Sequence, residues 1–165
     1  MKTIKTATAY LVFALIFMSC SQKENIIGLK EKIQHDDFEY SVQNVEKTER
    51  IGNIESKGMF YLVTFRVEND AKRVEHKWDN NIAYVTDKNE TIYKNIYDLQ
   101  INLKKVRDFS LKERYITYAG QNEETILVFD TPNDVKEPYL KVNGEFLMGD
   151  LFDGSQFKNT KVKLF

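Results

Sequence analysis

Cysteine and histidine, which supply most protein nucleophiles, general bases and metal-binding groups, are scarce in this chain. Its 165 residues include one cysteine, Cys20, and two histidines, His35 and His76. So few groups cannot build a histidine-based zinc site or a Cys–His nucleophile, and a single cysteine cannot form an intramolecular disulfide. We therefore expect that the protein is not an enzyme and that it holds no cofactor.

Carboxylates are the remaining candidates for metal binding. The segment from Asp150 to Gly154 offers two oxygen ligands, Asp150 and Asp153, before a turn glycine. It lacks the alternating acidic positions and the final glutamate of a calcium loop. We therefore predict no metal site and interpret the segment as a turn between the two final strands.

Aromatic side chains offer a third kind of chemistry, the stacking of a sugar or a peptide. Trp78, Tyr84, Tyr93 and Tyr97 would form such an aromatic platform if they were exposed and clustered, because Tyr and Trp contribute large contact areas at interfaces. The alternative is that they pack in the core and pair across strands, which the β preference of tyrosine favours.

The first twenty residues have the layout of a secretory signal. Two lysines precede an apolar stretch of about ten residues, which is too short to span a bilayer and is closed by Ser19 and Cys20. This layout resembles the signal of bacterial lipoproteins, in which the cysteine becomes the first mature residue. The resemblance implies removal of residues 1–19 and acylation of Cys20, as by palmitate, with membrane lipid as a partner. The alternative is an uncleaved signal anchor, which the short apolar stretch disfavours.

The residues after the cysteine bear on where the anchored protein resides. The run from Ser21 to Glu24 resembles the short signal that directs lipoproteins of the Bacteroides group to the outer leaflet, although a merely polar tether is an equal alternative. We expect a lipid-anchored protein of the cell membrane, with the outer membrane and surface exposure as the specific prediction.

Composition fixes the domain organisation and excludes one class of partner. Without the signal the chain would have 22 basic and 25 acidic side chains, a balance that argues against nucleic-acid binding. The remaining 146 residues suit one domain. We assign 1–19 to the signal peptide, 20–36 to a polar tether and 37–165 to the folded domain.

The pattern along that domain is typical of strands. Residues 59–68 alternate most clearly and are apolar on both faces at first, which predicts a central strand. Further strand patterns lie at 38–43, 115–118, 125–129, 139–142 and 161–165, with hairpins over 82–93 and around Asn143-Gly144. We assign 75–78 to a loop and interpret 97–111 as a crossover that allows a short helix. An all-β, immunoglobulin-like antiparallel sandwich of about seven or eight strands follows.

A family resemblance agrees with this fold. The runs from Asp37 to Val42 and from Phe60 to Asn69, the turn at 87–90, and the strand ending in Phe129-Asp130-Thr131-Pro132 resemble the telokin-like domains of bacterial secreted proteins known as DUF4352. The resemblance implies an immunoglobulin-like sandwich and assigns no catalytic residues.

Two functions follow from these features as hypotheses. The first is a non-enzymatic module that contacts an envelope protein through loops or a sheet edge. The alternative is a small-ligand or glycan-binding surface lipoprotein. An envelope hydrolase would need a nucleophile, a base and an orienting residue, and the sequence suggests no such set.

Overall fold

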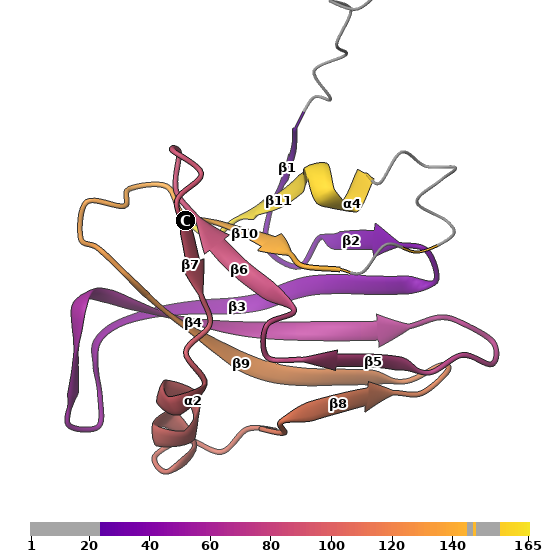
Figure 1. The fold of residues 1–165 in the computed structure, drawn as a ribbon, viewed down its shortest axis with the longest axis horizontal. Helices are drawn as coiled ribbons and strands as arrows, with labels where there is room; N and C mark the ends of the chain where they lie inside the picture. Colours follow the sequence, from indigo (N-terminus) through magenta and orange to yellow (C-terminus); the bar gives the residue numbers. More distant parts are fainter. Residues whose placement is uncertain (1–23, 145–146, 148–155) are drawn as a thin grey trace, which may run out of the picture.

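The computed structural model describes residues 24–144, 147 and 156–165, and these contain eleven strands in three sheets (Figure 1). The five-stranded sheet has the order β1 (Asn25–Ile27), β11 (Thr160–Lys163), β10 (Tyr139–Val142), β6 (Ala83–Thr86) and β7 (Ile92–Lys94). The four-stranded sheet has the order β2 (Lys32–His35), β3 (Phe38–Ile51), β4 (Ile54–Asn69) and β9 (Asn122–Thr131). A third sheet pairs β5 (His76–Asp79) with β8 (Arg114–Thr117). Two helices are α2 (Tyr97–Lys104) and α4 (Gln156–Asn159).

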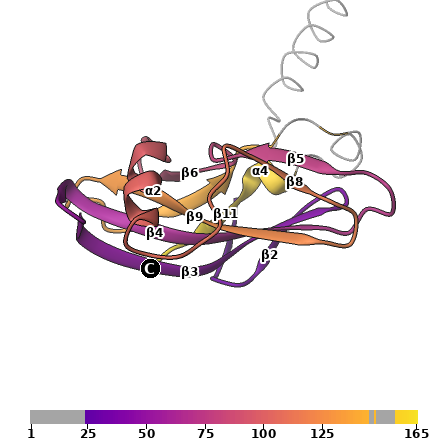
Figure 2. The ribbon, with the colours of Figure 1, turned by 90° about the horizontal axis from the view of Figure 1, so that it is seen from below.

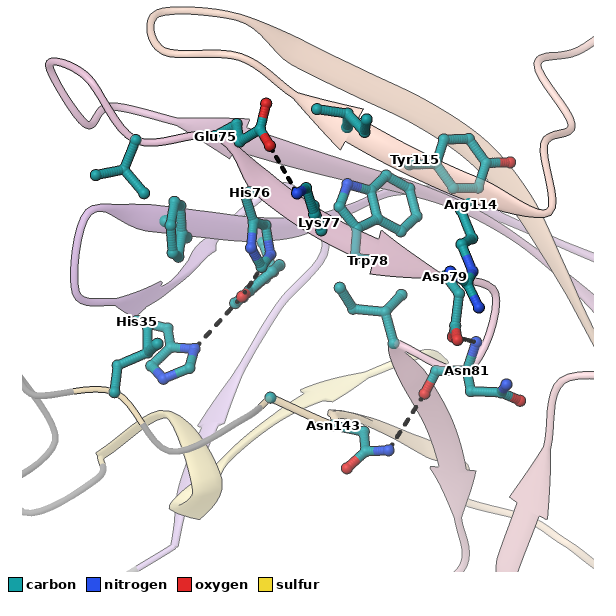
Figure 3. Close-up of a pocket in the computed structure, with 17 residues that line it drawn as sticks. His35, Glu75, His76, Lys77, Trp78, Asp79, Asn81, Arg114, Tyr115 and Asn143 are labelled. Atoms are coloured by element: carbon teal, nitrogen blue, oxygen red, sulfur yellow. Dashed lines mark hydrogen bonds and ion pairs between the residues drawn. The ribbon is translucent and has the colours of Figure 1, made fainter.

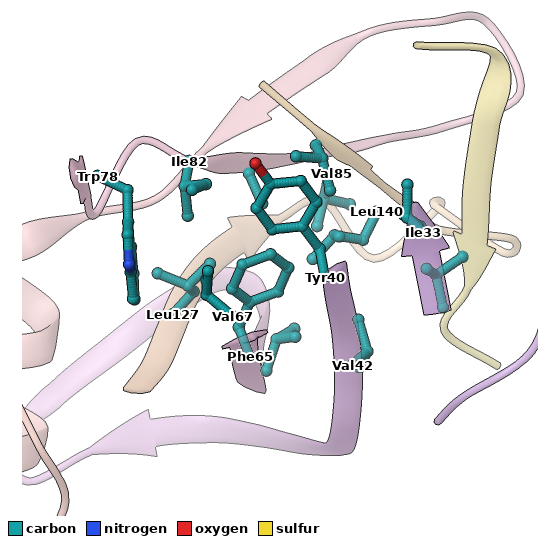
Figure 4. Close-up of a cluster of buried hydrophobic side chains, with 14 of the residues drawn as sticks. Ile33, Tyr40, Val42, Phe65, Val67, Trp78, Ile82, Val85, Leu127 and Leu140 are labelled. Carbon is teal, nitrogen blue, oxygen red and sulfur yellow. The ribbon is translucent and has the colours of Figure 1, made fainter. Parts of the chain in front are cut away.

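The main core lies between the four-stranded and the five-stranded sheets (Figure 4). Alternate residues of β4, among them Val63 and Phe65, point into it and meet Val85 of β6 and Leu140 of β10. All four side chains are fully buried. Trp78 of β5 belongs to the same cluster, so the β5–β8 pair closes the core at one end. Figure 2 shows β3 along one side of the molecule and β5 along the opposite side.

The other face of the four-stranded sheet is covered by α2. Phe60 and Leu62, the intervening residues of β4, pack with Leu99 and Leu103 of the helix and with Val128 of β9. The sheet is therefore buried on both faces where α2 lies, which explains why β4 begins with apolar residues at successive positions.

A network of buried amides holds α2 on the edge of β9. Gln100 is fully buried; its Nε2 donates to the carbonyl oxygen of Ile126 at 2.6 Å and its Oε1 accepts from Asn95 at 2.7 Å. The Asn95 side chain in turn accepts from the backbone N–H of Val128, whose carbonyl accepts from Ile96 N–H. These bonds pair backbone groups of an edge strand that would otherwise be open to other chains.

The predicted β-sandwich is confirmed, and so is the central position of its strongest strand. The pattern at 59–68 falls within β4, which lies between β3 and β9. The hairpin over 82–93 is β6–β7, and α2 forms within the predicted crossover. The β10 strand of the predicted Asn143-Gly144 hairpin pairs with β6 and β11. Most of 145–148 lies outside the described residues.

Three expectations need correction. Strands β1 and β2 lie inside the segment assigned to a tether, so the folded domain extends back at least to residue 25 and does not start at 37. The segment 75–78 is mostly strand β5 and not a loop. The strand count is higher than expected, and β1 runs parallel to β11 in an otherwise antiparallel arrangement. In β2 the alternation is present, with Ile33 and His35 buried, but a buried histidine reads as polar in a sequence pattern.

Candidate functional site

A pocket opens at the end of the sandwich where β2 and β3 face β5 and β8 (Figure 3). Its volume is about 870 Å³, within the range of small-molecule and peptide sites. The four strands contribute most of the lining, and residues beside them, among them Asn143 and Gly144 after β10, contribute the rest. The pocket therefore lies between the four-stranded sheet and the β5–β8 pair.

A chain of three polar rings crosses the inner wall of the pocket. The Tyr40 hydroxyl lies 3.1 Å from Nε2 of His76 and 3.4 Å from Nδ1 of His35. Because a hydroxyl has one proton, Tyr40 can donate to only one imidazole, and a bond to the other requires that imidazole to supply its own N–H. The tautomers of the two histidines are therefore coupled through Tyr40.

The pKa of His76 is lowered from 6.5 to about 4. Burial is the larger cause, since a desolvated imidazole disfavours its charged form, and repulsion from His35 adds to it. His76 is therefore neutral at physiological pH and is able to accept a hydrogen bond.

Ring stacking fixes both histidines. The Phe38 ring stacks on His76 with centroids 4.0 Å apart, and the Phe157 ring stacks on His35 at 3.7 Å. A Cβ atom at Gly144 would lie 2.8 Å from ring atoms of both His35 and Phe157. Only glycine lets the backbone pass this close, so Gly144 helps to shape the pocket.

The backbone of β5 forms one side of the pocket. Six consecutive residues, 74–79, line it. Neighbouring side chains of a strand point to opposite faces of its sheet. Consecutive residues therefore line the same pocket when the pocket lies beside the edge of the strand. Within the described residues β5 pairs with β8 alone. The pocket thus runs along an edge of β5 that has no strand partner in this part of the chain.

Charged groups at the mouth of the pocket are nearly balanced. Glu75 and Lys77 form an ion pair at 2.8 Å, and this bond raises the pKa of Lys77. Asp79 and Arg114 lie opposite each other in the β5–β8 register. The mouth is thus polar without favouring ligands of one charge.

The predicted aromatic platform is not assembled as one surface. Trp78 lines the pocket but is only 7% exposed, stacks on Tyr115 at 4.0 Å and donates from Nε1 to Thr117. Tyr84 and Tyr93 lie half-buried on β6 and β7, and Tyr97 is half-buried at the start of α2. None of these three tyrosines lines the pocket.

The other predicted site residues, Cys20, Asp150 and Asp153, lie outside the described residues. In the part of the chain that is described, no three His, Cys, Asp or Glu side chains gather as metal ligands. No helix there combines the length and apolar character that crossing a bilayer requires.

Comparison with known proteins places the chain by fold. No protein-family model matches it, so the DUF4352 resemblance is not confirmed, and no curated protein matches its sequence. Solved structures similar to it include the yjhA protein of Bacillus subtilis, with a TM-score of 0.58 and 12% identity over 84% of this chain and 98% of that one. The secreted protein MPT63 of Mycobacterium tuberculosis has a TM-score of 0.55 and 10% identity over 76% and 94% of the two chains.

A third similar structure is ycdA, a candidate lipoprotein of Bacillus subtilis, with a TM-score of 0.52 and 14% identity. The match covers 70% of this chain and 34% of ycdA. At such identities the likeness establishes the β-sandwich fold, and the activity of each protein must be argued from its own site.

The sequence pattern missed the residues at the centre of this pocket. The sequence pattern assigns His35 to a tether and His76 to a loop, whereas strand pairing brings both to Tyr40. The one available signal was the alternation of Ile33 and His35 with polar neighbours, which indicates a strand once histidine is allowed on the buried face.

Proposed function

We propose that the protein is a lipid-anchored binding module of the bacterial cell envelope, without catalytic activity, that binds an extended segment of another envelope protein. The signal layout before Cys20 supports the anchor. The secreted and candidate-lipoprotein descriptions of similar folds agree with an envelope location. Attachment to the outer membrane is the finer part of the proposal and depends on the segment from Ser21 to Glu24.

The open edge of β5 along the pocket is the observation that supports this function best. An extended peptide can add to a free edge through main-chain hydrogen bonds while its side chains enter adjoining pockets. Phe38, Trp78 and Ile82 supply an apolar wall for such side chains. Among the described lining residues there is no serine, threonine or cysteine to act as a nucleophile beside His76, which favours binding over hydrolysis.

Photocrosslinking in intact cells tests this proposal. A photoreactive residue replaces Val74 at the pocket mouth, which is 60% exposed, or Val106 after α2, which is 68% exposed and does not line the pocket. We expect one envelope protein to crosslink from position 74 and not from 106. A second probe is placed at Ile116, which also lines the pocket, and should crosslink to the same protein. Adding Val74→Glu should abolish the crosslink from position 116, and adding Val106→Glu should preserve it. Equal capture from both positions would contradict the proposal.

A small ligand or glycan in the same pocket is the second candidate, and the pocket volume favours it. Trp78 is the only tryptophan in the chain and lines the pocket, so intrinsic tryptophan fluorescence reports on this site alone. Titration with cell-wall glycan fragments, compared with unrelated extended peptides, separates the two candidates. A saturable change with glycans only would favour the second.

A further inference from the structure

We infer that the outer face of the five-stranded sheet lies against the surface of the bilayer. We define this outer face as the side of β1, β11, β10, β6 and β7 that points away from the core. The inference rests on the proposed acylation of Cys20 and adds to it a specific orientation of the domain.

The distance between the lipid and the folded domain is short. Only three residues separate Cys20 from Glu24, and a fully extended chain spans at most about 3.5 Å per residue, or about 14 Å in all. The polar layer of one leaflet is itself about 5–8 Å thick. The domain therefore has no long tether, because the segment expected to provide one folds as β1 and β2.

The point at which this short segment joins the domain is fixed on the outer face. Glu24 forms an ion pair of 2.5 Å with Lys161 of β11, and Ile26 pairs with Lys161 in the parallel β1–β11 register. The next residue of β11, Val162, points into the core, so Lys161 lies on the outer face, where Glu24, Glu90 and the Tyr139 ring cover it and leave it 7% exposed. An acyl chain on Cys20 would hold this corner of the sheet at the headgroups.

The composition of the outer face suits a bilayer surface. The strand residues on this face include four lysines and no acidic residue. The carboxylates near it belong to residues in turns or next to the ends of strands. The lysines are Lys94, Lys141, Lys161 and Lys163, and the carboxylates that pair with lysines of this set are Glu24 and Glu90. Lys94 and Lys163 are exposed and available to lipid phosphates.

Exposed apolar side chains complete this surface. Ile26 is 51% and Ile92 is 55% exposed, and Tyr84 lies half-buried between Lys141 and Lys94 in the register. Lysines, tyrosines and scattered isoleucines are the residues that lie at membrane interfaces. Because two of the four lysines, Lys141 and Lys161, are paired with carboxylates, the lipid anchor and not electrostatic attraction would hold this face in place.

Depth-dependent quenching tests the orientation. Acylation occupies Cys20, so Ile92→Cys or Val106→Cys introduces the single free thiol for a fluorescent label. Val106 is the matched control because it follows α2, which packs on the far side of the four-stranded sheet. The acylated proteins are placed in vesicles of phosphatidylethanolamine and phosphatidylglycerol that contain a nitroxide-labelled lipid. We expect the label at 92 to lose most of its fluorescence and shift to the blue, and the label at 106 to match the detergent-solubilised protein.

The outcomes separate the inference from the proposed function. If mass analysis shows no acyl group on Cys20, both fail. If the protein is acylated and the two labels are quenched equally, only the orientation fails. Insertion of about twenty Gly and Ser residues after Ser21, a flexible chain of roughly 25 Å, should bring quenching at 92 down towards that at 106. Unchanged quenching would overturn the role given to the short segment.

Discussion

Mild acid should destabilise the protein through His76. This imidazole is neutral in the folded state, where its pKa is about 4, and has the ordinary value of 6.5 when unfolded. Between these two values the unfolded chain binds more protons than the folded one, so acidification favours unfolding. Protonation would also remove the ability of His76 Nε2 to accept a hydrogen bond from the Tyr40 hydroxyl, which lies 3.1 Å away.

The magnitude follows from the two pKa values of His76. By proton linkage, protonation of His76 in the unfolded chain lowers the free energy of unfolding by only about 0.2 kcal/mol at pH 7 and by about 2 kcal/mol at pH 5. The side chain is partly exposed, and solvent screening reduces the difference to about 1 kcal/mol. The carboxylates with lowered pKa, such as Glu46 and Asp87, contribute mainly below pH 4.5. The range from pH 5 to 7 therefore avoids the titration of these carboxylates.

Urea denaturation of the mature chain with Cys20→Ser, at pH 5, 6 and 7, measures this effect. His76→Phe is the control, because a phenyl ring can keep the stacking on Phe38 while it removes the titrating nitrogen. We expect the parent to lose about 1 kcal/mol from pH 7 to pH 5, and the variant to lose much less. An equal loss in both proteins would refute the assignment of the pH dependence to His76.

Two further predictions concern folding stability. Gln100→Leu should lower the free energy of unfolding by about 2–4 kcal/mol, because it leaves the Ile126 carbonyl and the Asn95 amide without their buried partner; the exposed Ile101→Leu is the control for urea denaturation. Gly58→Ala should cost about 2 kcal/mol or more, because the new Cβ would lie 2.4 Å from the Thr131 carbonyl oxygen and meets backbone on that side. A melting temperature within 1–2 °C of the parent, a shift of well under ~1 kcal/mol, would contradict either prediction.

The sandwich could be predicted from the sequence because its long strands carry their own signal. In β4 the residues on both faces are apolar where α2 covers the sheet and alternate where it does not, and this pattern is local. The short strands lack such a signal. β1 is three residues long, and its place beside β11 depends on a pairing across more than 130 residues, which no local pattern encodes.

The pocket could not be predicted for a related reason. Its polar centre needs a histidine from β2, a tyrosine from β3 and a histidine from β5. Each position alone is unremarkable, and only the pairing of distant strands brings the three side chains together. Trp78 was identified from its residue type, but its stacking on Tyr115 is a tertiary contact that turns an expected platform residue into part of the wall.

The pocket and the proposed membrane face lie at related places on the fold, and this narrows the class of partner. Asn25, where β1 begins, pairs with Thr160 at the start of β11. Because β10 is antiparallel to β11, the same end of the sheet holds the end of β10 and then Asn143 at the pocket rim. With the proposed acyl group on Cys20, a chain held within about 14 Å of its lipid at that end would keep the pocket close to the bilayer. On this arrangement we expect the segment bound along β5 to come from a protein that is itself associated with the membrane.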